Sequence, residues 1–247
     1  MSDADILDEL GLAPLYVRRA LRAPCDASAS VAPAENVVRD APAVMARVAL
    51  PGDDERVARI ARLTLDALAE DVAACTACRL CRTRNRAVPG VGDPAADWLF
   101  IGEAPGAEED ARGEPFVGQA GKLLDAMLAA LDLDRRRRVY IANVLKCRPP
   151  GNRAPEPGEA AACEPYLARQ VELIAPKIIV ALGRSAAALL LGNDAPIASL
   201  RGRVHRLGGR PLVVTYHPAY LLRNLPDKAK AWEDLLFARR VLKTGSE

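Results

Sequence analysis

Apolar runs of strand length alternate with helical segments along most of this chain. "DWLFIG" (97–102), "RVYIANV" (138–144) and "PKIIVALG" (176–183) are nearly continuous apolar runs, and segments of helical periodicity separate them. Strands of this kind are typical of a parallel sheet that helices cover on both faces. A predicted hairpin with paired glycines follows at 202–218. This order predicts an α/β fold with three α/β/α layers and a central, mainly parallel sheet.

Composition divides the chain into three parts. Residues 1–22 carry apolar residues at helical spacing, interrupted by Pro14, and predict a short helical element. Residues 23–52 are rich in Ala, Pro, Ser and Asp, which is the composition of a flexible linker. Residues 53–247 are the predicted folded domain. No apolar run reaches the roughly 20 residues of a membrane helix, and the start lacks the plan of a signal peptide, so we expect a soluble, cytoplasmic protein.

Cysteine is scarce and unevenly placed. The six cysteines are Cys25, Cys75, Cys78, Cys81, Cys147 and Cys163. In a cytoplasmic chain, thiols more often bind metal or lie buried than form disulfides. Cys75 and Cys78 form one close pair, and the two downstream cysteines form a second. Two pairs predict a four-thiolate site for zinc or an iron–sulfur cluster, and the alternative is a set of small buried side chains.

Polar motifs follow the predicted strands directly. They are "GEAPG" (102–106), "NVLKCRPPGN" (143–152) and "TYHPAYLLR" (215–223). Functional residues of such sheets gather beyond the carboxyl ends of the strands, where these motifs emerge. Asn143 offers a hydrogen-bond donor and an acceptor that can read one edge of a pyrimidine, or else it caps a turn.

The loop after the last predicted strand holds a histidine and an apolar pair. His217 precedes a proline and is rigidly presented, whereas we expect His205, between arginines, at the surface. Leu221 and Leu222 beside Arg223 form an apolar wedge next to a cation, which can push a base out of a duplex. The alternative is that both leucines begin the core face of the next helix.

Net charge alone does not indicate a nucleic-acid binder, because it is only +2 at pH 7. Arginine is nonetheless concentrated in three segments, 134–140, 146–153 and 200–206. A local basic cluster is sufficient to contact phosphates. The alternative for each cluster is a solvated helix end or loop.

Taken in order, these motifs resemble those of the family 4 uracil-DNA glycosylases, the iron–sulfur branch of the uracil-DNA glycosylase superfamily. The resemblance covers about residues 70–242 and rests on "CTACRLCRTRNRAVPGVG", "IGEAPGAEEDARGEPFVGQAGKLLD", "YIANVLKCRPPGNRAPEPGEAAAC", "LRGRV" and "TYHPAYLLR". It implies a uracil-DNA glycosylase-like fold and an enzyme that flips uracil out of DNA and hydrolyses its N-glycosidic bond. The abasic site that this leaves starts base excision repair.

The resemblance also implies roles for individual residues. The ligands of a [4Fe–4S] cluster would be Cys75, Cys78, Cys147 and Cys163, with Cys81 outside the set. The uracil pocket would contain Gly102, Glu103, Ala104, Phe116, Asn143 and His217, of which Glu103, Asn143 and His217 are the catalytic candidates. Supporting candidates are Glu109 and Asn152. The DNA-binding candidates are Arg148, Arg153, Arg201, Arg203, Leu221, Leu222 and Arg223.

Three of these residues would contact the flipped base directly. Phe116 corresponds to the aromatic side chain on which the flipped base stacks, Asn143 to the residue that pairs with the pyrimidine edge, and His217 to the histidine facing uracil O2. Bond cleavage leaves negative charge on uracil, which a hydrogen bond at O2 and fixed amides would stabilise.

Two positions depart from better known branches of the superfamily. Ala104 replaces an aspartate that assists the attacking water, which favours a dissociative mechanism helped by Glu103 or Glu109. Gly106 replaces a tyrosine that excludes thymine. We hypothesise that Glu109, or the loop around it, excludes the thymine methyl group instead.

Two other functions remain open from the sequence. One is a non-catalytic uracil- or DNA-binding iron–sulfur accessory protein, and the other is a scaffold built on a zinc site. The segment after "KCRPPGNR" contains no histidine or insertion, which argues against relatives that trap uracil covalently. The expected partner is uracil-containing DNA, single- or double-stranded, with no membrane involved. We expect a monomer whose amino-terminal arm docks a repair or replication protein.

Overall fold

A computed structural model describes residues 53–244 of the chain. The helical element predicted at 1–22 and the linker predicted at 23–52 lie outside the described residues. Within the described part, no helix has both the length and the apolar character that crossing a membrane requires.

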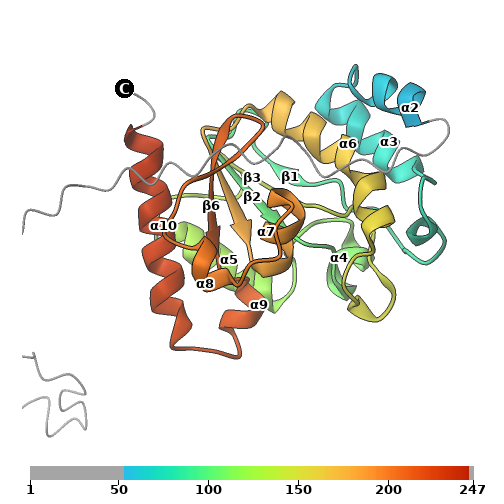
Figure 1. The fold of residues 1–247 in the computed structure, drawn as a ribbon. Helices are drawn as coiled ribbons and strands as arrows, with labels where there is room; N and C mark the ends of the chain where they lie inside the picture. The colour runs from blue at the N-terminus through green and yellow to red at the C-terminus, as the bar shows by residue number, and fades with distance from the viewer. Residues whose placement is uncertain (1–52, 245–247) are drawn as a thin grey trace, which may run out of the picture. The chain divides into compact units, whose positions relative to one another are not determined.

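Six strands of the described part form one sheet, in the order β1-β3-β2-β4-β6-β5 (Figure 1). The strands are β1 (Val91–Gly92), β2 (Trp98–Gly102), β3 (Val139–Asn143), β4 (Ile178–Leu182), β5 (His205–Leu207) and β6 (Arg210–Thr215). Parallel pairs join β2 to β3, β2 to β4 and β4 to β6, whereas the short edge strands β1 and β5 are antiparallel. The predicted α/β fold with a mainly parallel sheet is confirmed.

Helices cover both faces of this sheet (Figure 1). They are α2 (Asp53–Ile60), α3 (Leu65–Ala74), α4 (Ala107–Arg112), α5 (Gln119–Ala129), α6 (Pro157–Ile174), α7 (Arg184–Leu191), α8 (Ile197–Leu200), α9 (Pro218–Leu221) and α10 (Asp227–Thr244). Short 3-10 turns, η1 (Arg79–Arg82) and η2 (Pro150–Asn152), interrupt the loops. Helices α6 and α7 pack on one face, and α5 and α10 pack on the other.

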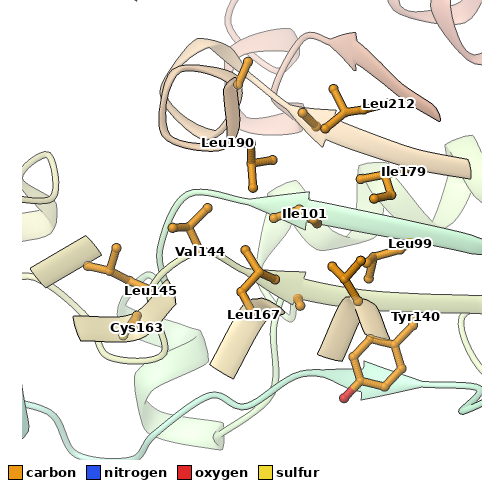
Figure 2. Close-up of a cluster of buried hydrophobic side chains, with 14 of the residues drawn as sticks. Leu99, Ile101, Tyr140, Val144, Leu145, Cys163, Leu167, Ile179, Leu190 and Leu212 are labelled. Carbon is orange, nitrogen blue, oxygen red and sulfur yellow. The ribbon is translucent and has the colours of Figure 1, made fainter. Parts of the chain in front are cut away.

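The core follows from the alternation of side chains along each strand. Leu99 and Ile101 of β2 pack with residues of α6 and α7, in the cluster that Figure 2 shows. Trp98 and Phe100 point to the opposite face and pack with residues of α5 and α10. Every residue of β2, β3 and β4 is buried. This burial on both faces explains why the strands read as nearly continuous apolar runs.

One of the two antiparallel edges of the sheet is the predicted hairpin of β5 and β6. It turns at Gly208 and Gly209, whose positive φ angles of 55° and 76° suit a tight two-residue turn. His205, expected at the surface, is only 8% exposed. Its Nε2 lies 2.8 Å from the carbonyl oxygen of Leu200 at the end of α8. That prediction was wrong because the ring turns inward to the end of α8, a contact that local sequence does not reveal.

The parallel strands end together at one edge of the sheet. Gly102 is in register with Asn143, and Leu182 is in register with Thr215. The segments that follow β2, β3 and β6 therefore emerge side by side, as expected for the carboxyl edge of a parallel sheet.

Candidate functional site

A cavity of about 460 Å³ opens at the carboxyl edge of the sheet. We call it the base pocket. Its lining residues are Glu103, Ala104, Pro105, Gly106, Glu109, Phe116, Ala120, Asn143, Pro149, Asn152, Arg153, His217, Ala219 and Arg223. The catalytic candidates Glu103, Asn143 and His217, which come from three separate motifs, thus surround one space.

Gly102 sets the depth of the base pocket at the end of β2. A Cβ at this position would lie 2.4 Å from Oδ1 of Asn143 and 2.7 Å from Cζ of Phe116. Any larger residue would push both side chains out of place, because packed interiors do not absorb such overlaps. Asn143 is itself only 2% exposed and ends β3. Its amide is therefore held at the floor of the pocket.

Glu109, in the first turn of α4, holds the loop that carries Phe116. Its Oε1 accepts hydrogen bonds from the backbone N–H groups of Val117 (3.0 Å) and Gly118 (3.3 Å), and its Oε2 accepts one from Gly106 (3.1 Å). A carboxylate bonded to several backbone N–H groups is firmly oriented. Glu109 therefore joins the loop after β2 to the loop before α5.

Phe116 has a positive φ of 54°, which is uncommon for an aromatic residue. Arg135 stabilises this conformation from behind the pocket: its Nη1 donates to the carbonyl oxygen of Pro115 at 3.0 Å and its Nη2 to that of Phe116 at 2.8 Å. Gly121 approaches so closely that a Cβ there would lie 1.7 Å from the Phe116 carbonyl oxygen. The aromatic ring is thus fixed through its own backbone.

His217 is the N-cap of α9, and its Nδ1 accepts a hydrogen bond from the N–H of Ala219 at 3.1 Å. Nδ1 therefore carries no proton, and Nε2 is the donor of the neutral ring. Burial lowers the pKa of His217 to about 4, so the ring is neutral at pH 7. The ring centroid lies 5.5 Å from that of Phe116. His217 thus brings a neutral donor to the pocket beside an aromatic ring.

Glu103 and Ala104 follow β2 at the rim of the pocket. Burial raises the pKa of the Glu103 carboxyl group, and a hydrogen bond with Ser185 opposes that shift. The Glu103 carbonyl oxygen accepts from the N–H of Leu145 at 3.0 Å, which ties this rim to the loop after β3. Ala104 brings no polar side chain to the pocket.

The loop around η2 forms the mouth of the pocket. Arg148 Nε donates to Oδ1 of Asn152 at 2.8 Å. Arg153 makes two hydrogen bonds with Glu159, at 2.9 and 2.6 Å, and its guanidinium holds the pKa of that carboxyl below its usual range. The charge of Arg153 is therefore balanced within the protein, since the pair ties the loop to α6.

Two of the DNA-binding candidates are largely buried. Arg201 has only 15% of its side chain exposed, because its Nε bonds Oδ2 of Asp234 at 2.7 Å and its guanidinium lies 4.9 Å from the ring centroid of Tyr216. Leu221 is 1% exposed and packs in a cluster with Tyr216. Leu222, the next residue, is 42% exposed. Leu221, the last residue of α9, is thus buried, whereas Leu222, directly after the helix, lies at the surface.

A second cavity is lined by thiols, and we call it the thiol cavity. Its lining residues are Val72, Cys75, Ala77, Cys78, Cys81, Arg84, Lys146, Cys147, Ala162, Cys163 and Tyr166. The four predicted ligands thus face one space, although they come from the end of α3, the start of η1, the loop after β3 and α6. Within residues 53–244, no three Cys, His, Asp or Glu side chains converge closely enough to hold a metal ion.

The surroundings of these thiols suit a thiolate-bound metal group. Arg84 Nη1 donates to Sγ of Cys147 at 2.9 Å. Burial raises the pKa of Cys163 to about 12. Such a thiol becomes a thiolate at neutral pH only when a metal ion replaces its proton. The donor set and its cationic neighbour therefore fit a metal group that carries negative charge.

Arg135 and Lys146 were missed by the sequence analysis. Arg135 belongs to an arginine-rich segment for which the sequence offers two interpretations, contact with phosphates or a solvated surface. Lys146 is 1% exposed, within a run of buried residues at 139–147. A single charge inside an apolar run is a usable signal, because lysine is almost never fully buried without a partner.

Comparison with known proteins gives consistent matches. The model of the uracil DNA glycosylase superfamily matches residues 89–236. The type-4 uracil-DNA glycosylase of Archaeoglobus fulgidus is 47% identical over 167 residues, 64% of this chain and 83% of the relative. That of Thermotoga maritima is 43% identical over 183 residues, 72% of this chain and 95% of the relative. The type-5 uracil-DNA glycosylase of Thermus thermophilus is 34% identical over 155 residues, 53% of this chain and 68% of the relative.

Proposed function

Because this chain belongs to the type-4 uracil-DNA glycosylases of the uracil DNA glycosylase superfamily, we propose that the base pocket is where it holds a flipped uracil during hydrolysis of the N-glycosidic bond. The chain is a DNA glycosylase, and its substrate is DNA. The product is an abasic site, from which base excision repair proceeds.

One observation carries the assignment of the pocket: a buried amide, an aromatic ring and a neutral histidine donor line the same cavity. Asn143 can pair with the edge of uracil that carries both an N–H and a carbonyl. Phe116 can stack on the face of the base. The pocket can therefore recognise a single pyrimidine that has left the duplex.

His217 is proposed to stabilise the leaving group. Bond cleavage builds cationic character on the sugar and negative charge on uracil. A hydrogen bond from a fixed donor to uracil O2 is stronger in the transition state than in the ground state, because negative charge grows on that oxygen. Such a difference is the requirement for catalysis. The neutral ring with its proton on Nε2 supplies that hydrogen bond without transferring a proton.

Glu103 is the better candidate for orienting the attacking water. The oxygens of Glu109 are occupied by backbone N–H groups, whereas Glu103 lines the pocket beside Ala104. Since Ala104 cannot take a proton or orient water, we propose a dissociative reaction. The glycosidic bond breaks first and leaves a sugar cation and a uracil anion. Water held near Glu103 then attacks C1′, and the proton that it loses neutralises the uracil anion.

Thymine is proposed to be excluded by the loop that Glu109 organises. The three hydrogen bonds of Glu109 connect Gly106 to the segment that carries Phe116. A Glu109→Ala enzyme would loosen this wall, so we expect it to release some thymine from DNA. Unchanged rejection of thymine by an otherwise active variant would contradict the hypothesis.

DNA contacts are proposed for Arg148, Arg203, Leu222 and Arg223. Arg203 and Arg223 are exposed, and Arg223 lines the pocket. Arg148 lies at the same mouth, and Leu222 offers an apolar side chain beside Arg223. Cations can hold phosphates while an apolar side chain occupies the space that a flipped base leaves. Asn152 and Arg153 are assigned a supporting role, because Asn152 is bonded to Arg148 and Arg153 to Glu159 of α6.

The thiol cavity is proposed to hold a [4Fe–4S] cluster through Cys75, Cys78, Cys147 and Cys163. The hydrogen bond from Arg84 Nη1 to Sγ of Cys147 supports a bound group that carries negative charge. When bound, the cluster would cross-link segments that are distant in the sequence. A colourless purified protein that contains zinc would overturn this assignment.

Glycosylase activity on defined oligonucleotides tests the proposal. The protein is incubated with single-stranded DNA that contains uracil, and with duplexes that place uracil opposite G or A, and the abasic sites are then cleaved with alkali. Strand cleavage is expected at uracil and not at cytosine in matched controls. Binding to uracil-containing DNA without cleavage of any substrate would favour the accessory-protein alternative.

A further inference from the structure

Lys146 lies between the thiol cavity and the base pocket. It is 1% exposed and lines the thiol cavity. Its Nζ donates to the carbonyl oxygen of Asn143 at 2.7 Å and to Oε1 of Gln170 at 2.6 Å. The side chain thus folds back from the loop to the last residue of β3, the residue whose amide forms the floor of the base pocket.

The charge of Lys146 is balanced by neither of these partners, since both are neutral oxygens. Among the described residues, Lys146 makes no ion pair with a carboxylate. Two of the proposed ligands, Cys147 and Cys163, line the same cavity as Lys146. A buried ammonium without a countercharge is costly. Thiolates bound to a metal group would provide that countercharge.

Gln170, on α6, fixes the other side of the ammonium group. Its Nε2 donates to the carbonyl oxygen of Pro89 at 2.7 Å, which leaves Oε1 facing Lys146. The Lys146 carbonyl oxygen also accepts from the N–H of Val88 at 2.8 Å. Both the backbone and the side chain of Lys146 are therefore held in place. Figure 2 shows Val144, Leu145 and Cys163 at the same end of the core, beside the end of β3.

We propose that Lys146 is a positioning residue that links the metal-bound thiolates to Asn143 and so holds the base-reading amide in register. This inference rests on the proposed function of both cavities. On the thiol side, the charge of the bound group fixes the ammonium. On the pocket side, the ammonium fixes the carbonyl of Asn143. The metal group thereby contributes to base recognition without touching DNA.

The test compares iron-loaded variants of the full chain. Lys146→Met removes the charge and the donor at similar volume, and Lys146→Gln keeps a donor without the charge. Gln170→Leu removes one partner of Nζ, and Lys122→Met, at an exposed position of α5, is the matched control. Iron content, melting temperature and the inhibition constant of free uracil are measured for each, alongside cleavage of uracil-containing DNA.

We expect Lys146→Met to keep its iron, because all four ligands remain, and to bind free uracil about tenfold more weakly. Lys146→Gln should recover part of this loss, Gln170→Leu should show a smaller one, and Lys122→Met should match the parent. Uracil binding equal to the parent in iron-loaded Lys146→Met overturns the inference. Should Lys146→Met fail to fold, unchanged uracil binding in iron-loaded Gln170→Leu overturns it. A parent protein that cleaves no uracil-containing DNA and binds no uracil contradicts the proposed function instead.

Discussion

The base pocket and the thiol cavity are built on opposite principles. The base pocket forms where adjacent parallel strands end, and its polar groups already have partners: Glu109 binds backbone N–H groups, and His217 accepts from Ala219. The thiol cavity draws on separate segments from α3 to α6, and buries a lysine whose partners are neutral. The pocket is therefore organised before its ligand arrives, whereas the cavity needs its bound group to be complete.

This difference predicts two kinds of mutational effect. Changes in the thiol cavity should act first on folding and only then on activity, because metal binding is coupled to folding. Changes in the base pocket should reduce activity in a protein that still folds, because the pocket rests on strands that are already paired within the sheet. Variants that violate this division would contradict the comparison.

The largest effect is expected at the thiol cavity. Cys78→Ala should lose most of its iron and lower the melting temperature by more than about 10 °C. In a chain of this size, a loss of 1 kcal/mol in the free energy of unfolding lowers the melting temperature by roughly 2–4 °C. Cys81→Ala is the control, as it lines the same cavity outside the proposed ligand set. Iron analysis and thermal melts check this. Iron loss in Cys81→Ala with retention in Cys78→Ala would mean that the ligand pairs are wrongly assigned.

In the base pocket, His217→Leu should lower kcat by about 10² to 10³, because removal of one preorganised donor costs this much in comparable sites. Single-turnover cleavage of uracil-containing DNA measures the chemical step. Iron content should equal that of the parent. A variant that lost its iron along with its activity would show that the two regions are not independent in the way described.

His217 also predicts how stability depends on pH. Its pKa is lowered to about 4 in the folded chain, against an ordinary value of 6.5. Between these values the unfolded chain binds more protons than the folded one, so stability rises with pH. From pH 7 to pH 5 the parent should lose roughly 2 kcal/mol that His217→Gln does not lose. Thermal melts of both proteins at these pH values provide the measurement, and parallel curves would contradict the prediction.

A smaller effect is expected behind the pocket. Arg135→Ala removes two hydrogen bonds that hold the positive φ of Phe116. We expect kcat/KM to fall about tenfold, in line with the loss of one to two net hydrogen bonds. The neighbouring exposed Arg136→Ala provides a matched loss of charge. Equal losses in the two variants would indicate a charge effect on DNA rather than support of the aromatic ring.

The smallest effect is expected at the DNA surface. Arg203→Ala should weaken DNA binding only a few-fold and reduce the slope of log K against log salt by about 1. Arg201→Ala should instead lower the melting temperature, because it leaves Asp234 buried without its partner. Binding titrations at several salt concentrations distinguish the two. A change in salt slope for Arg201 alone would reverse the assignment.

The fold and the central residues of the pocket were accessible from sequence because they depend on local patterns. Apolar runs predicted the parallel strands, and short motifs at their ends predicted the residues that now line one cavity. The burial of three other residues was not visible in local patterns. Arg201 pairs with Asp234, 33 residues further on, and Leu221 packs with Tyr216. His205 was wrongly expected at the surface, because its ring bonds the carbonyl oxygen of Leu200. Arg135 and Lys146 were missed because both donate hydrogen bonds to backbone carbonyl oxygens. A sequence does not show which carbonyl oxygen a side chain reaches.

Gly102 has a consequence for any attempt to change the base that this protein accepts. The atoms that meet there belong to the amide at the floor and to the aromatic ring, so one added carbon displaces both. In directed evolution toward other damaged bases, substitutions at Gly102 should therefore not yield active variants. New specificities should therefore arise from substitutions at the rim and mouth, where side chains can change size one at a time while the floor stays the same.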